Sequence, residues 1–147
     1  MLRVRRATED DRLNLFKLCI QMHQETDFQA VALNPEKVIN SLGLWINGNL
    51  SLVVVKDSDI VGMLFASVNT PWFSDERYAT EDILYVTPEY RGTRAGYLLV
   101  RGFMDWVKQT GVKHVRAGVS TGTGPAAERL YRHFGMSYMG GNFIAHF

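Results

Sequence analysis

Two acidic residues and a tyrosine are the side chains of this sequence best suited to proton transfer. Glu81 and Asp82 stand at the head of an apolar segment typical of a strand, and Tyr131 lies in a helical pattern near the C-terminal end. A carboxylate can take a proton from a nucleophile, and a phenol can donate a hydrogen bond to a leaving group. Because successive strand residues point to opposite faces, Glu81 and Asp82 should face opposite sides of a sheet. The two acids could instead lie at a solvated strand end, and the tyrosine could be part of the hydrophobic core. The sequence alone leaves these alternatives open.

A glycine-containing loop joins a strand pattern to a helix pattern directly after these acids. Residues 83–87 are strand-like, and residues 91–96 (RGTRAG) lead into an amphipathic segment. Backbone N–H groups at a helix start, together with the helix dipole, form a site for a phosphate group. The spacing differs from that of a Walker loop, and it is equally typical of a plain strand-to-helix turn.

The elements that position these residues follow from the hydrophobic pattern. Strands are predicted at residues 2–6, 50–56, 60–69, 79–87 and 112–120, helices at residues 9–26, 35–47, 97–109 and 125–134, and one or two short strands within residues 136–147. The strand-helix-strand unit within residues 79–120 should be a parallel crossover, whereas the earlier strands are linked by a hairpin turn. The order β-α-α-β-β-β-α-β-α-β therefore predicts a single α/β domain, residues 1–147, with a mixed α+β arrangement in which helices cover both faces of a central mixed sheet.

Composition narrows the class of protein. The chain has 147 residues and a formal charge of +1, which argues against a dedicated nucleic-acid binder. Cys19 is the single cysteine and the four histidines have no ligand spacing, so we expect neither a disulfide nor a metal site. The best apolar run, residues 60–66, is far shorter than the roughly 20 residues of a membrane span, and no export signal is evident. We therefore expect a soluble, cytoplasmic protein with no membrane partner.

Two other motif matches lack the partners that their chemistry needs. Residues 118–122 fit the nucleophile elbow G-x-S-x-G, but the only acid downstream is Glu128, and the chain is too short for the parallel sheet of that fold. Residues 122–127 fit a dinucleotide fingerprint, but no acid follows at the distance needed to bind a ribose. We interpret this segment as a helix start, with Thr123 as N-cap and Pro125 in the first turn.

Residues 83–96 resemble the GNAT superfamily of N-acyltransferases. In that family a strand ending near V-x-P leads into a loop, [QR]-x-x-G-x-[GA], that cradles the pyrophosphate of coenzyme A. Residues 91–96 fill its six positions, and residues 130–136 (LYRHFGM) are similar to a second landmark, a helix ending L-Y-x-x-x-G-[FM]. Residues 5–11 are similar to the family's first strand and helix, and the order of elements agrees over the whole chain.

The resemblance implies an enzyme that moves an acetyl group from acetyl-CoA to a primary amine of a small molecule or protein. It places the coenzyme A site at Leu84, Tyr85, Val86, Arg91, Gly92, Thr93, Arg94, Ala95, Gly96 and Tyr97. Asp82 falls where diamine-type members carry a catalytic Glu, and Glu81 is the other candidate base. Tyr131 is expected to donate a hydrogen bond to the departing sulfur, because full proton transfer from a phenol to a thiolate is uphill by roughly 2 kcal/mol.

Two departures from the family pattern motivate an alternative, a GNAT-like module that binds coenzyme A without turnover. Position four of the loop is Arg94 where the family has Gly, which would cost about 1 kcal/mol or more in a left-handed backbone and little in a helical one. Gly124 stands where family members often have an Asn that contacts pantetheine. Trp72 and Phe73, on the loop before the central strand, suit either a cationic substrate or an interface, and with the terminal strand they lead us to expect a homodimer.

Overall fold

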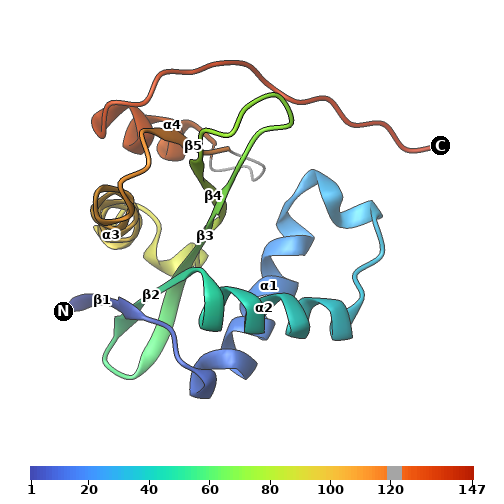
Figure 1. Ribbon diagram of the computed structural model, residues 1–147. Coiled ribbons are helices and arrows are strands. Elements are labelled where there is room, and N and C mark those ends of the chain that lie inside the picture. The colour runs from blue at the N-terminus through green and yellow to red at the C-terminus, as the bar shows by residue number, and fades with distance from the viewer. Residues whose placement is uncertain (119–123) are drawn as a thin grey trace.

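The structure is a computed structural model that describes residues 1–118 and 124–147 (Figure 1). Its strands are β1 (Leu2–Arg6), β2 (Leu50–Lys56), β3 (Asp59–Asn69), β4 (Tyr78–Val86) and β5 (His114–Arg116). Its helices are α1 (Arg12–Glu25), α2 (Pro35–Gly48), α3 (Ala95–Thr110) and α4 (Gly124–His133), with short 3-10 turns η1 (Glu9–Asp11), η2 (Asp27–Ala30) and η3 (Pro88–Tyr90). No helix within the described residues is long and apolar enough to cross a membrane.

The strands form one mixed sheet in the order β1-β2-β3-β4-β5. The first four strands pair antiparallel, and β4 pairs with β5 in parallel, as the short strand-helix-strand crossover predicts. Helices α1 and α2 cover one face, and α3 and α4 cover the other (Figure 1). The predicted fold class, a mixed sheet between two helical layers, is therefore confirmed.

The helix starts follow the capping signals in the sequence. The Thr8 backbone N–H donates to Asp11 Oδ2 at 2.8 Å, which completes a capping box before α1. The Asn34 side chain accepts from the Lys37 N–H at 3.2 Å, and Pro35 occupies the first position of α2. Helix α3 begins at Ala95, two residues before the predicted start, so Gly96 belongs to its first turn.

A bulge in β4 decides which side chains reach the site. The register with β3 shifts between Phe65 and Ala66, whose partners are Ile83 and Glu81, so Asp82 is the extra residue. Glu81 consequently lies on the α3/α4 face, whereas Asp82 and Ile83 both lie on the α1/α2 face. Without the bulge, residues 81 and 83 would share a face.

The prediction of terminal strands was wrong. The described residues 136–147 contain no strand, and the chain beyond Met136 is exposed. Strand β5 pairs through only three residues and offers too short an edge for a further ladder, and Gly140, at φ +147°, interrupts the segment that would have to pair. The predicted strand at residues 112–120 is seen as His114–Arg116, and positions 119–123, including the Thr123 cap and parts of both rejected motifs, lie outside the described residues.

Candidate active site

A cleft of about 680 Å³ opens where β4 and β5 separate. The parallel ladder ends at the pair Thr80 and Arg116, and the two strands diverge beyond it. The cleft is lined by β4, the start of α3, one side of α4 and the end of α1, including Glu81, Leu84, Val86, Gly92, Gly96, Tyr97, Leu130 and Tyr131. A separation between parallel strands at their carboxyl ends is a usual place for a ligand in an open α/β sheet.

The Glu81 carboxyl group bridges this separation. Its Oε2 accepts the Gly118 backbone N–H at 3.3 Å and the Tyr131 hydroxyl at 3.0 Å. Glu81 is only 6% exposed, and this burial raises the pKa of its carboxyl to about 7, although the two hydrogen bonds act in the opposite direction. The group can therefore be either ionised or protonated near neutral pH, as a general base requires.

The Tyr131 hydroxyl has one proton and two neighbouring acceptors. It lies 3.0 Å from Glu81 Oε2 and 3.3 Å from the carbonyl oxygen of Gly118. Burial, and secondarily the nearby Glu81, raise the pKa of this phenol well above its ordinary value, so it remains a donor. When Glu81 is protonated, its O–H can donate to Tyr131, whose own proton can then turn to Gly118 or to a ligand in the cleft.

Asp82 lies on the opposite face of the sheet from Glu81, as strand alternation predicts. Its Oδ2 accepts the Trp45 indole N–H at 3.0 Å and the Ser67 hydroxyl at 2.8 Å, and the residue is exposed. The structure thus separates the two candidate bases by environment: Glu81 is buried in the strand gap, and Asp82 is open to solvent on the α1/α2 side.

The free edge of β4 carries unpaired backbone groups beside Glu81. The Thr87 N–H donates to the Val61 carbonyl at 2.9 Å, so the alternation of the antiparallel ladder turns the N–H groups of Leu84 and Val86 away from β3. These groups point to the side where β5 has diverged. The side chain of Tyr85 instead lies on the α1/α2 face, where its hydroxyl donates to Glu25.

The start of α3 offers a row of free amides. Within residues 1–118 and 124–147, no protein acceptor takes the N–H groups of Gly92, Arg94, Gly96 and Tyr97. Gly92 has φ +81°, where glycine is favoured, whereas Arg94 has φ −77° and ψ 0°. The expectation that Arg94 avoids a left-handed backbone is therefore confirmed, and this helix start can bind an anion.

The Arg91 side chain is held by the protein itself. Its Nε donates to the Val86 carbonyl at 2.9 Å, one terminal nitrogen donates to Glu25 Oε1 at 2.7 Å, and its guanidinium lies 5.4 Å from the Tyr85 ring centroid. Glu25, Tyr85 and Arg91 thus connect the end of α1 to β4 and to the loop before α3. Glu25 could not be found from the sequence, because its partners are 60 and 66 positions away and no local pattern marks it.

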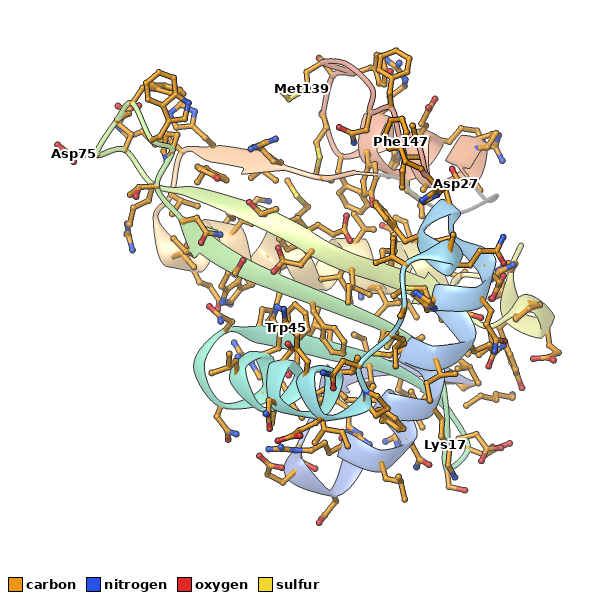
Figure 2. All side chains as sticks on the ribbon, turned by 90° about the vertical axis from the view of Figure 1, so that its right-hand side faces the viewer. Lys17, Asp27, Trp45, Asp75, Met139 and Phe147 are labelled. Atoms are coloured by element: carbon orange, nitrogen blue, oxygen red, sulfur yellow. The ribbon has the colours of Figure 1, made fainter. Side chains whose placement is uncertain are left out.

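Several other aromatic and ionisable residues lie away from the cleft. Trp72 and Phe73 are 96% and 72% exposed and pack only edge-to-face on one another among the described residues. Figure 2 shows Asp75, on the same loop, at the far end of the sheet from Asp27, so this loop is not part of the cleft wall. The homodimer expected from this loop stays a prediction. Among the described residues, no three His, Cys, Asp or Glu side chains form a group that could hold a metal ion.

The sequence of this chain belongs to the acetyltransferase (GNAT) family, which it matches over residues 18–136. The family resemblance expected from residues 91–96 and 130–136 is confirmed. No protein among the curated sequences compared with the chain matches it.

Solved structures with the same fold extend over nearly the whole chain. A transcriptional regulator from Bacillus halodurans C-125 has a TM-score of 0.76 at 20% identity, covering 100% of each chain. An aminoglycoside acetyltransferase from an uncultured soil metagenomic sample, in complex with sisomicin, has a TM-score of 0.68 at 18% identity, covering 99% of this chain and 93% of that one. An aminoglycoside N-acetyltransferase in complex with CoA has a TM-score of 0.76 at 11% identity, covering 99% and 94%. Identities this low establish a common fold and nothing about the substrate of this chain.

The burial of Glu81 should make stability depend on pH in a defined window. The folded protein keeps the Glu81 proton up to about pH 7, whereas an unfolded chain releases it near the ordinary value of 4.5. The contribution of Glu81 to the free energy of unfolding should therefore be fully present below pH 4.5, fall by about 3 kcal/mol as the pH rises to 7, and then stay constant. Urea denaturation of the protein and of Glu81→Gln across this range isolates the effect. A constant difference between the two proteins would contradict the raised pKa.

Proposed function

We propose that this chain transfers the acetyl group of acetyl-CoA to a primary amine. The observation that carries the proposal is the buried carboxyl of Glu81, which is poised near neutral pH in a cleft whose other walls present free backbone N–H groups. A base, an anion site and an extended backbone edge are what an acyl transfer from a phosphate-bearing thioester needs.

The residues of the cleft fit the parts of coenzyme A. The free amides of Gly92, Arg94, Gly96 and Tyr97 would bind its pyrophosphate at the positive end of the α3 dipole. The N–H groups of Leu84 and Val86, on the unpaired edge of β4, would bind the amide groups of the pantetheine arm. Arg91 supports this loop from behind, because its guanidinium is bound to Glu25 and to the Val86 carbonyl.

Glu81 is the proposed general base. An alkyl amine has a pKa near 10.4, so only about one molecule in 2,500 is neutral at pH 7, and the attacking nitrogen must lose a proton as its bond to carbon forms. A carboxyl with a pKa of about 7 is substantially ionised at that pH and is far more basic than an exposed carboxylate. Asp82 lines the same cleft from the α1/α2 side and is exposed, so it is left for contact with the incoming ammonium group.

Tyr131 would link the base to the departing sulfur. Once Glu81 holds the amine proton, its O–H can donate to the Tyr131 hydroxyl, which releases the tyrosine proton to hydrogen-bond the thiolate. A thiolate whose conjugate acid has a pKa of about 8.5 takes a proton from a carboxyl of pKa about 7 with a gain of about 2 kcal/mol. An amine that arrives as an ammonium ion first releases one proton to solvent. The second proton, lost as the N–C bond forms, passes to Glu81, the Tyr131 proton passes to the sulfur, and Glu81 returns a proton to Tyr131, so that both side chains regain their starting states.

The site for the pyrophosphate is tested by placing a negative charge at the start of α3. Gly96→Asp should weaken coenzyme A binding at least tenfold, because its carboxylate faces the anion that the free amides attract. An acid in the first turn of a helix stabilises that helix, so the variant should fold. Calorimetric titration with coenzyme A measures the effect.

Gly96→Ala is the matched control for this variant. It introduces the same Cβ, which would lie 3.1 Å from Leu130 Cδ1, without the charge. Near-parental binding by Gly96→Asp would place the anion elsewhere. If the parent binds coenzyme A but releases no thiol with any amine, the alternative of a non-catalytic coenzyme A module is favoured. Gly124 still motivates that alternative. Arg94 no longer does, because its backbone is not left-handed.

The role of Tyr131 is tested by removing its hydroxyl. Tyr131→Phe should lower kcat roughly a hundredfold, about 3 kcal/mol, because the lost donor acts on charge that develops only as the C–S bond breaks. Acetyl-CoA affinity should hold within a few-fold. Turnover, binding and melting temperature are measured on one preparation, and full turnover per folded molecule would contradict the assignment.

A further inference from the structure

A second groove, of about 440 Å³, lies between α1, α2 and the segment that connects them. Its lining is mostly apolar, with Cys19, Met22, Phe28, Val31, Ala32, Leu33, Val38, Trp45 and Ile83. Phe28 and Val31 are 50% and 52% exposed, so the groove leaves large apolar side chains open to solvent.

Local hydrogen bonds hold the outer wall of this groove in place. The Thr26 hydroxyl accepts the Phe28 N–H at 3.2 Å and caps η2. The His23 Nε2 lies 2.8 Å from the Val31 carbonyl, which ties the segment after η2 back to α1. These hydrogen bonds fix the backbone of the wall, and therefore the positions of its apolar side chains.

The groove is continuous with the cleft that contains Glu81. Met22, His23, Phe28 and Ile83 line both of them. Asp82 lies at the junction, since it lines the cleft and accepts the indole N–H of Trp45, which lines the groove. A ligand with its charged end at Asp82 can thus lay an apolar arm along the groove.

The charge of the groove selects against a second cation. Among the described residues that line it, Lys37 carries the only full charge, and it is positive. A ligand bearing an ammonium group at its far end would have to desolvate that group against apolar walls near a like charge. Sisomicin, the aminoglycoside bound in one of the similar structures, carries several such groups.

We propose that the acceptor is a primary amine with a single ammonium group and an apolar arm, which the α1/α2 groove binds while Asp82 receives the ammonium. This substrate class rests on the proposed acetyl transfer. The proposed substrate differs from the polycationic amines that some acetyltransferases use. The groove offers apolar contact and a positive charge, whereas a polycation would need carboxylates there.

Two amines with the same six-carbon chain test the proposal. Hexylamine and 1,6-diaminohexane differ only at the end that would lie in the groove, so hexylamine should be acetylated with at least tenfold higher kcat/KM. Ser41→Phe fills the groove from α2 and should abolish this preference. Asn40→Phe adds the same ring at an exposed neighbouring position of the helix and should leave the preference intact.

Calorimetric binding of both amines to the coenzyme A complex keeps this test independent of turnover. Tighter binding of hexylamine that Ser41→Phe removes supports the groove even if no amine is acetylated, in which case the proposed acetyl transfer alone fails. Equal or better use of 1,6-diaminohexane, or an unchanged preference in a folded Ser41→Phe variant, overturns the assignment.

Discussion

The hydrogen-bonded carboxyl of Glu81 is the interaction on which the rest of the site depends. A carboxyl that is 6% exposed persists in a protein only where donors satisfy it, and here the Gly118 N–H and the Tyr131 hydroxyl do so. These two contacts link β4, the end of β5 and α4 across the gap where the parallel ladder stops. Hydrogen bonds therefore join the two sides of the gap, and the group at their centre is the ionisable carboxyl that the proposed chemistry uses.

A second polar link connects the two sides of the cleft. Glu25, at the end of α1, binds both Tyr85 on β4 and Arg91 at the start of the loop before α3. The ion pair is about 29% exposed at each partner, so solvent weakens it and its main effect is to fix position. The walls of the proposed acceptor groove and the loop proposed to hold the pyrophosphate thus share one anchor.

Local signals in the sequence were sufficient for most of the fold and for the loop that leads into α3. The capping residues Thr8 and Asn34, the hairpin and the crossover each depend on neighbouring positions, and the predictions made from them are confirmed. The distinction between Glu81 and Asp82 could not be made in this way, because it depends on a bulge and on contacts 37 to 50 positions away. The prediction of terminal strands was wrong for a similar reason: the local sequence cannot show that the neighbouring strand is only three residues long.

The pH dependence of kcat at saturating amine distinguishes Glu81 from Asp82 as the general base. With Glu81 as the base, kcat of the parent should rise with pH through about 7 and then level off. In Glu81→Gln, kcat should be much lower and should no longer rise with pH through about 7, whereas in Asp82→Asn this rise should remain. A rise near pH 7 that survives in Glu81→Gln, or that disappears in Asp82→Asn, would contradict the role of Glu81 as the base.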